Sequence, residues 1–184
     1  MSADYKYEDH LETKRLFTRF LTSEDIFIWT NFFNDKEAVE LFPTFGLNTN
    51  EERAKNWIDK SIARYQENRF GLQALIDKQS NDFIGQCGLM EQVVDGETEI
   101  EVGYHIFKKY WGRGYAPEAS RAFIDYAFRN DLTDSVISII DTRNIKSQRV
   151  ADKNGLKKVK QTNWSGIDVF IYRIQRKLIE SLNE

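Results

Sequence analysis

Two closely spaced glycines stand immediately before a predicted helix, in the run Tyr-Trp-Gly-Arg-Gly-Tyr-Ala-Pro-Glu-Ala at positions 110–119. Gly112 and Gly114 can adopt backbone conformations closed to other residues, and without side chains they let a ligand approach the amides. Pro117 falls in the first helical turn, where its missing N–H is not needed. The unpaired amides and the helix dipole then favour an anion, most readily a phosphate or a pyrophosphate.

The spacing excludes two familiar phosphate-binding motifs. The dinucleotide fingerprint G-x-G-x-x-G would need a third glycine where this chain has Pro117. No G-x-x-x-x-G-K-[ST] sequence occurs, which excludes a P-loop. On spacing alone, the alternative is a structural strand-to-helix turn that binds no ligand.

The elements that must position this turn follow from hydrophobic periodicity and from turn residues such as Asp95-Gly96. The order is strand, two helices, three antiparallel strands, helix, strand, helix and two strands, which predicts a mixed α/β sheet. No repeat or Pro/Gly linker occurs, so we expect one domain over residues 1–184. The expected strands are 12–21, 71–76, 83–94, 98–107, 136–140, 157–162 and 167–176, and the expected helices are 22–33, 50–66, 116–129 and 145–154.

Three segments resemble motifs of the GNAT N-acetyltransferase superfamily. The turn Trp111-Gly-Arg-Gly-Tyr-Ala116 matches the family's Q/R-x-x-G-x-G/A turn from the glycine onward, and the longer run is similar to the branch of ribosomal-protein alanine acetyltransferases. Ile100-Glu-Val-Gly-Tyr-His105 resembles the family's E-I-G-Y strand. Asn144-Ile-Lys-Ser147, followed by Asn154-Gly155-Leu156, is similar to its N-x-x-S…N-G-F segment.

The resemblance implies a single GNAT-like domain with a mostly antiparallel sheet of about seven strands, a splayed fourth and fifth strand, and flanking helices. It places the cofactor-binding core at about 81–155 and implies acetyl-CoA as cosubstrate. The acetyl group would pass to a primary amine by direct attack in a ternary complex. The cofactor-binding residues it implies are Tyr104, Ile106, Phe107, Trp111, Gly112, Arg113, Gly114, Tyr115, Ala116, Asn144 and Ser147.

Three residues are candidates for proton transfer. Glu101 is the candidate general base, with a structural strand glutamate as the alternative. On a strand it shares a face with His105, which has a suitable unperturbed pKa or is simply a packed side chain. Many family members protonate the leaving thiolate with a Tyr beyond the Asn, but positions 148–154 contain none. Ser147 is the substitute that the resemblance suggests.

The acceptor site of this superfamily is built by the first helices and the last strands. Trp29, Phe33 and Phe45 are candidates to shape an amine site through cation–π contacts, with simple core packing as the alternative. The acceptor is expected to be a small-molecule amine or a protein N-terminus, and a homodimer is one expected assembly.

The composition of the chain argues against several classes of protein. A net charge of −3 and a pI near 5.6 argue against a nucleic-acid-binding protein. No apolar run approaches the roughly 20 residues of a membrane span, and no signal-peptide core is evident, so we expect a cytoplasmic protein. Cys87 is the single cysteine and is expected in the core, and the presence of only two histidines excludes a His-rich metal site. The competing interpretations are a non-catalytic acyl-CoA-binding or sensing domain and a structural, partner-binding domain.

Overall fold

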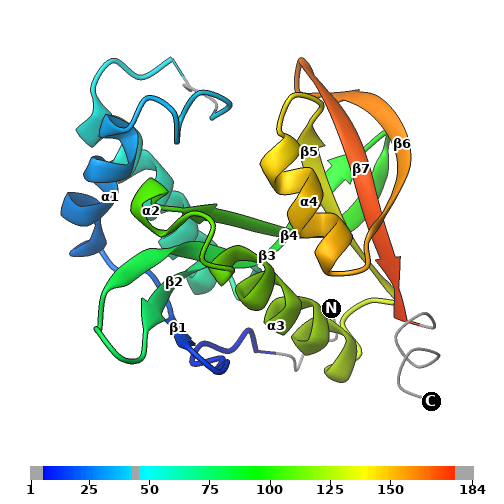
Figure 1. The fold of residues 1–184 in the computed structure, drawn as a ribbon, viewed down its shortest axis with the longest axis horizontal. Helices are drawn as coiled ribbons and strands as arrows, with labels where there is room; N and C mark the ends of the chain where they lie inside the picture. The colour runs from blue at the N-terminus through cyan, green and yellow to red at the C-terminus, as the bar shows by residue number, and fades with distance from the viewer. Residues whose placement is uncertain (1–5, 43–45, 177–184) are drawn as a thin grey trace.

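The computed structural model describes residues 6–42 and 46–176, and within them seven strands form one mixed sheet in the order β1-β2-β3-β4-β5-β7-β6 (Figure 1). Neighbouring strands are antiparallel except for the parallel pair β4 and β5. The strands are β1 (Leu16–Arg19), β2 (Leu72–Asp77), β3 (Phe83–Val94), β4 (Glu97–Ile106), β5 (Ser135–Asp141), β6 (Lys157–Trp164) and β7 (Ile167–Gln175). The predicted mixed, mostly antiparallel sheet is confirmed.

Four α-helices flank the sheet within the described residues, namely α1 (Asp25–Asn34), α2 (Asn50–Gln66), α3 (Tyr115–Arg129) and α4 (Ile145–Lys153). A short 3₁₀ turn, Lys108–Tyr110, connects β4 to the glycine turn. The start of α2 is fixed by a capping box, because the Thr49 hydroxyl accepts from the Glu52 amide (3.1 Å) and the Glu52 carboxylate accepts from the Thr49 amide (3.0 Å).

The helices cover the sheet in two groups. Figure 1 shows α1 and α2 together at one end of the molecule and α3 and α4 on the front of the sheet. Trp29 and Ile58, from α1 and α2, are buried in one apolar cluster with β2. Phe123 of α3 and Ala151 of α4 are buried in a second cluster with β3 and β4. Each group therefore buries the apolar stripe of its helices against a different part of the sheet.

The first strand is shorter than predicted. We expected a strand over 12–21, but the chain folds back before β1, where the Thr13 amide donates to the Leu16 carbonyl (2.9 Å) and Glu12 bridges to Phe17. Residues 12–15 are all polar, so the apolar positions that support a strand begin only at Leu16. By contrast, the predicted Asp95-Gly96 turn is confirmed, with φ of 52° and 87° as a tight hairpin requires.

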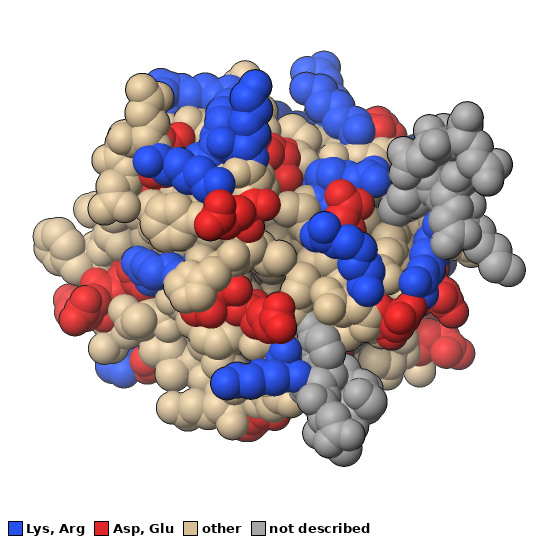
Figure 2. Space-filling view, turned by 90° about the horizontal axis from the view of Figure 1, so that it is seen from below, with Lys and Arg blue, Asp and Glu red and all other residues tan. Residues whose placement is uncertain are grey.

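One face of the molecule is mixed in charge. On the face seen from below, basic and acidic side chains are interspersed (Figure 2). Among the residues that the structure describes, no helix is both long and apolar enough to span a membrane.

Candidate active site

The parallel strands β4 and β5 stay paired only briefly. Their register joins Ile100 to Val136 and Glu101 to Ile137. Beyond that point β4 continues along β3 as far as Ile106, whereas β5 continues along β7. The two strands therefore part after Glu101, as the resemblance implied, and leave a gap in the middle of the sheet.

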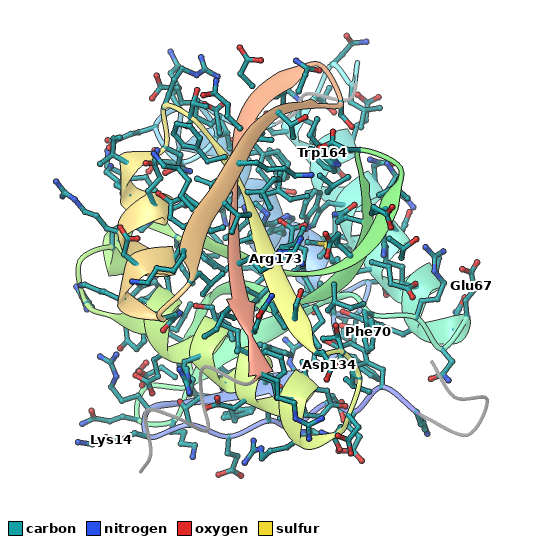
Figure 3. All side chains as sticks on the ribbon, turned by 90° about the vertical axis from the view of Figure 1, so that its right-hand side faces the viewer. Lys14, Glu67, Phe70, Asp134, Trp164 and Arg173 are labelled. Atoms are coloured by element: carbon teal, nitrogen blue, oxygen red, sulfur yellow. The ribbon has the colours of Figure 1, made fainter. Side chains whose placement is uncertain are left out.

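The closed end of this gap is held by an ion pair between strands. Arg173 lies on β7, in the layer that faces the viewer in Figure 3. Its guanidinium pairs with the carboxylate of Glu99 on β4 and also donates to the Ser135 hydroxyl at the start of β5. Three strands are thus tied together just before the point where β4 and β5 separate.

The alternation of hydrogen bonds along β4 decides which of its backbone groups face the gap. The Phe107 amide donates to the Ile84 carbonyl on β3 (3.0 Å), so the odd-numbered residues of this end of β4 bond to β3. The backbone groups of Tyr104 and Ile106 then point to the other side, which β5 has left. Phe107 does not fit its predicted cofactor role in this respect, since its amide is already used and its ring packs against Trp29 (5.6 Å between centroids).

The glycine turn adopts the backbone that its sequence predicts. Gly112 and Gly114 have φ of 75° and 80°, in the left-handed region that favours glycine. Gly114 caps α3, and a Cβ at Gly112 would meet nothing within 4 Å. The first amides of α3 therefore begin at a turn that is open to a ligand on one side.

A cavity of about 480 Å³ joins the glycine turn to the gap between the strands. Tyr104 and His105, which point to opposite faces of β4, both line it, so it reaches both faces of the sheet. Gly112, Gly114 and Asn144 line it as well. Of the residues predicted to bind the cofactor, those in the lining are Tyr104, Ile106, Trp111, Gly112, Gly114, Tyr115, Ala116, Asn144 and Ser147. Phe107 and Arg113 are not in it, and the Arg113 side chain is exposed.

The start of α4 forms one wall of the cavity. Asn144 caps the helix, as predicted, with its side-chain oxygen accepting from the Ser147 amide (3.0 Å). The Tyr104 hydroxyl reaches across from β4 and donates to the Ser147 carbonyl (3.4 Å). Burial raises the pKa of Tyr104, so its phenol stays protonated and remains a hydrogen-bond donor.

Glu101 lies buried where the strands part rather than in the lining of the cavity. Its carboxylate accepts from the Ile139 amide on β5 (3.2 Å) and from the Gln92 side chain (2.9 Å). Burial raises the pKa of Glu101 to about 7, although both of these hydrogen bonds lower it. A carboxyl with such a pKa can take up and release a proton near neutral pH.

Comparison with known proteins identifies this arrangement. The family described as the acetyltransferase (GNAT) domain matches residues 15–157. The chain belongs to this GNAT family. Over 178 residues it is 26% identical to an uncharacterized N-acetyltransferase of Bacillus licheniformis, covering 91% of this chain and 96% of that protein.

Two solved structures share the GNAT fold. An acetyltransferase from Agrobacterium tumefaciens matches with a TM-score of 0.77 and 24% identity, over 94% of this chain and 97% of that one. The ribosomal-protein acetyltransferase RimL, solved in complex with coenzyme A, matches with a TM-score of 0.74 and 14% identity, over 91% and 98% of the two chains. The resemblance to ribosomal-protein acetyltransferases is thus confirmed at the level of the fold.

Two of the three aromatic residues predicted to bind the acceptor, Trp29 and Phe33, are core residues in this GNAT domain. Trp29 is fully buried and stacked on Phe32 (4.3 Å between centroids), and Phe33 is buried beside them. Neither Trp29 nor Phe33 lines the cavity, whereas Phe32 does. Phe45 lies outside the described residues. Aromatic residues at helical spacing mark the buried face of α1, and only the fold decides which of them reaches a cavity.

His105 is enclosed by aromatic rings where it meets the cavity. The centroids of the Phe42 and Trp57 rings lie 4.9 and 5.2 Å from the centroid of its imidazole. Burial lowers the pKa of His105 to about 4, so the ring is neutral at pH 7 and a weak proton acceptor. The structure therefore supports His105 as a packed side chain better than it supports His105 as a base.

Several lining residues were missed by the sequence analysis. Basic side chains from the start of α4 and along its length line the cavity, namely Arg143, Lys146, Arg149 and Lys153. The last three recur at three- and four-residue intervals, which places them on one face of a helix and was a signal available in the sequence. The loop after α1 also lines the cavity, and its Glu37 pairs with Lys146 (2.7 Å).

Proposed function

We propose that this protein transfers the acetyl group of acetyl-CoA to a primary amine of a small molecule or of a protein N-terminus, by direct attack in a ternary complex. The observation that carries the proposal is the cavity lined by both Tyr104 and His105. Because it opens to both faces of β4 through the gap, a donor and an acceptor can meet there from opposite sides of the sheet.

The residues on one side of the cavity suit the donor. Gly112 and Gly114 present the first amides of α3, which favour the pyrophosphate of the coenzyme. Arg149 and Lys153 add positive charge on the facing helix. The backbone groups of Tyr104 and the amide of Ile106 would hold the pantetheine arm, since the Ile106 carbonyl already accepts from Trp111 Nε1 (2.7 Å). Acetyl-CoA supplies the thioester whose carbonyl carbon is attacked.

The bond changes define what the protein must supply. The neutral amine nitrogen forms a bond to the carbonyl carbon, the carbon–sulfur bond breaks, the nitrogen loses a proton, and the sulfur leaves as a thiolate that is protonated by solvent. Holding the two reactants together accounts for a large part of such an acceleration. The remaining tasks are to accept the proton of the amine and to stabilise the thiolate.

Glu101 is our proposed proton acceptor. Its pKa of about 7 suits proton uptake near neutral pH, and its position where the strands part puts it at the closed end of the gap. Since Glu101 does not line the cavity, the proton passes through a bridging water.

Tyr104 and Ser147 both line the wall of the cavity at the start of α4, where the Tyr104 hydroxyl donates to the Ser147 backbone carbonyl. We propose that the Tyr104 hydroxyl donates a hydrogen bond to the leaving thiolate, with Ser147 as the second donor on that wall. A thiol is acidic enough to leave with modest help, so a hydrogen bond from a protonated phenol suffices.

The proposal is tested first by ligand binding and then by turnover. Acetyl-CoA or coenzyme A at 100 times its dissociation constant should raise Tm by roughly 5–10 °C, while NAD should not. A panel of amines is then screened for release of free coenzyme A thiol. Glu101→Gln should lower kcat at least tenfold, and Glu97→Gln, an exposed residue of the same strand, serves as the control.

Two outcomes would contradict the proposal. If neither acetyl-CoA nor coenzyme A raises Tm, the protein does not bind the proposed acetyl donor. A shift with no turnover on any amine, and no effect of Glu101→Gln, would instead favour the non-catalytic acyl-CoA-binding domain.

A further inference from the structure

Arg15 joins the segment before β1 to the glycine turn and the first turn of α3. Its Nε donates to Glu118 Oε2 (2.6 Å) and its backbone amide donates to Glu118 Oε1 (2.9 Å). Its Nη1 donates to the carbonyl of Arg113, the residue between the two glycines (2.8 Å). One side chain therefore fixes a turn residue and a helix residue at once.

Glu118 is bound from a second direction as well. Its Oε1 accepts from the Thr13 hydroxyl (2.6 Å). Burial opposes ionisation of this carboxyl, but the hydrogen bonds from Thr13 and Arg15 outweigh burial and lower the pKa of Glu118. Glu118 is therefore a charged partner for Arg15 at neutral pH, in a geometry with several charge-assisted hydrogen bonds.

Tyr115 completes this support behind the turn. The Arg15 guanidinium lies 4.4 Å from the centroid of the Tyr115 ring, and the Tyr115 hydroxyl donates to Asp77 at the end of β2 (2.8 Å). A Cβ at Gly114 would lie 3.4 Å from Arg15 Nη2, so the guanidinium packs directly against the turn.

None of the charged members of this support touches the cavity. Gly112, Gly114 and Tyr115 line it, whereas Arg15, Asp77 and Glu118 do not. Two glycines give the turn more conformational freedom than any other residues would. A turn of this kind holds its amides in one direction only if other groups restrain it, and Arg15 restrains it from outside the cavity.

We propose that Arg15 is a positioning residue for the diphosphate of the donor, acting through the Arg113 carbonyl and Glu118 rather than by touching the donor. This inference rests on the proposed function. It implies that Arg15 serves the phosphate-bearing part of the donor and leaves the thioester end unaffected.

The test compares two acetyl donors that differ in that part. Acetyl-CoA carries the diphosphate, and S-acetyl-pantetheine lacks it. In Arg15→Gln, kcat/KM for acetyl-CoA should fall about 10–100-fold through KM, while kcat/KM for S-acetyl-pantetheine should stay within about twofold of the wild type. Arg121→Gln, which removes an arginine paired with Asp125 further along α3, is the matched control and should change neither value.

A conservative variant keeps the test valid if Arg15→Gln folds poorly. Arg15→Lys retains the charge but loses the planar fork that reaches Glu118 and the Arg113 carbonyl together, so an intermediate loss on acetyl-CoA alone is expected. Equal losses on both donors, or no loss on either, would overturn the positioning role while leaving the proposed function intact. Failure of the wild type to bind coenzyme A would overturn both.

Discussion

The carboxylate of Glu101 on β4 accepts a hydrogen bond from the amide of Ile139 on β5, at 3.2 Å. The register of the two strands has ended two residues earlier on β5, at Ile137. A side chain thus takes the place that a backbone carbonyl of β4 would hold in a continued parallel ladder. Where the strands part, this half-buried amide therefore still has a hydrogen-bond partner, and that partner is an ionisable group.

The stability of the protein should fall as the pH rises through neutrality because of Glu101. Its pKa in the folded protein is about 7, above its ordinary value near 4.5. The stabilisation is complete below pH 4.5 and is lost as the pH rises through 7, by up to about 1.4 kcal/mol per pH unit. Thermal unfolding from pH 4.5 to 8.5 should show this slope in the wild type and a shallower one in Glu101→Gln. Equal slopes in the two proteins would contradict the shift.

The pH dependence of the acetyl-transfer rate should report the same ionisation of Glu101. If deprotonated Glu101 accepts the proton, kcat/KM rises with pH and levels off above about 7. In Glu101→Gln this limb should disappear together with most of the rate, whereas Glu97→Gln should retain both. An unchanged limb in Glu101→Gln would assign the ionisation to another group, such as the substrate amine.

Local patterns predicted the elements that depend on periodicity and turn chemistry. The helix at 50–66 and the strand at 83–94 match α2 and β3 in both bounds. The glycine turn could also be predicted, because its positive φ values depend on the residues of the turn itself.

Contacts between residues far apart in the sequence could not be predicted in this way. Arg15 and Glu118 are 103 positions apart, and no local pattern links them. The burial that shifts the pKa of Glu101 arises only when β4, β3 and β5 are assembled.

Tyr104 should matter more for the chemical step than Ser147. The Tyr104 hydroxyl donates to the backbone carbonyl of Ser147, not to its side chain, so Ser147→Ala leaves this contact in place. We expect Tyr104→Phe to lower kcat about 10–100-fold with coenzyme A affinity changed less than about threefold, and Ser147→Ala to lower kcat less than about fivefold. Tyr172→Phe is the control, because the Tyr172 hydroxyl contacts Gln148 on the same helix (3.4 Å) but Tyr172 does not line the cavity. A larger effect of Ser147→Ala would restore the serine as the main donor.

Cys87 should be chemically silent in the folded protein. It is fully buried on β3, and burial raises the pKa of its thiol, so both access and ionisation are suppressed. A thiol reagent should label no cysteine in the native state and one after denaturation, as the sequence contains one. Cys87→Ala should lower Tm through lost packing but leave kcat within about twofold. Loss of turnover in a folded Cys87→Ala protein would point instead to a covalent acetyl-enzyme.

Glu37 should weaken coenzyme binding by pairing with two lysines, of which Lys146 lines the cavity. Its carboxylate pairs with Lys108 and Lys146 (2.7 Å each), and the Lys146 ammonium also lies 4.0 Å from the centroid of the Trp111 ring. The hydrogen bonds from the two lysines lower the pKa of Glu37 to about 2, so the carboxylate is charged throughout the working range of pH. Since the coenzyme is a polyanion, Glu37→Gln should free both lysines and tighten coenzyme A binding several-fold at low salt.

The salt dependence and a matched variant separate this charge effect from a change in loop position. At about 0.5 M salt the affinities of the wild type and Glu37→Gln for coenzyme A should converge, because exposed charges are screened there over a few ångströms. Glu40→Gln removes the same charge from the same cavity wall, and no ion pair joins Glu40 to either lysine among the described residues. It should therefore change the affinity less than Glu37→Gln in isothermal titration calorimetry. Weaker binding by Glu37→Gln at every salt concentration would show instead that the pairs hold the loop over the coenzyme, and that closing the cavity outweighs the charge they neutralise.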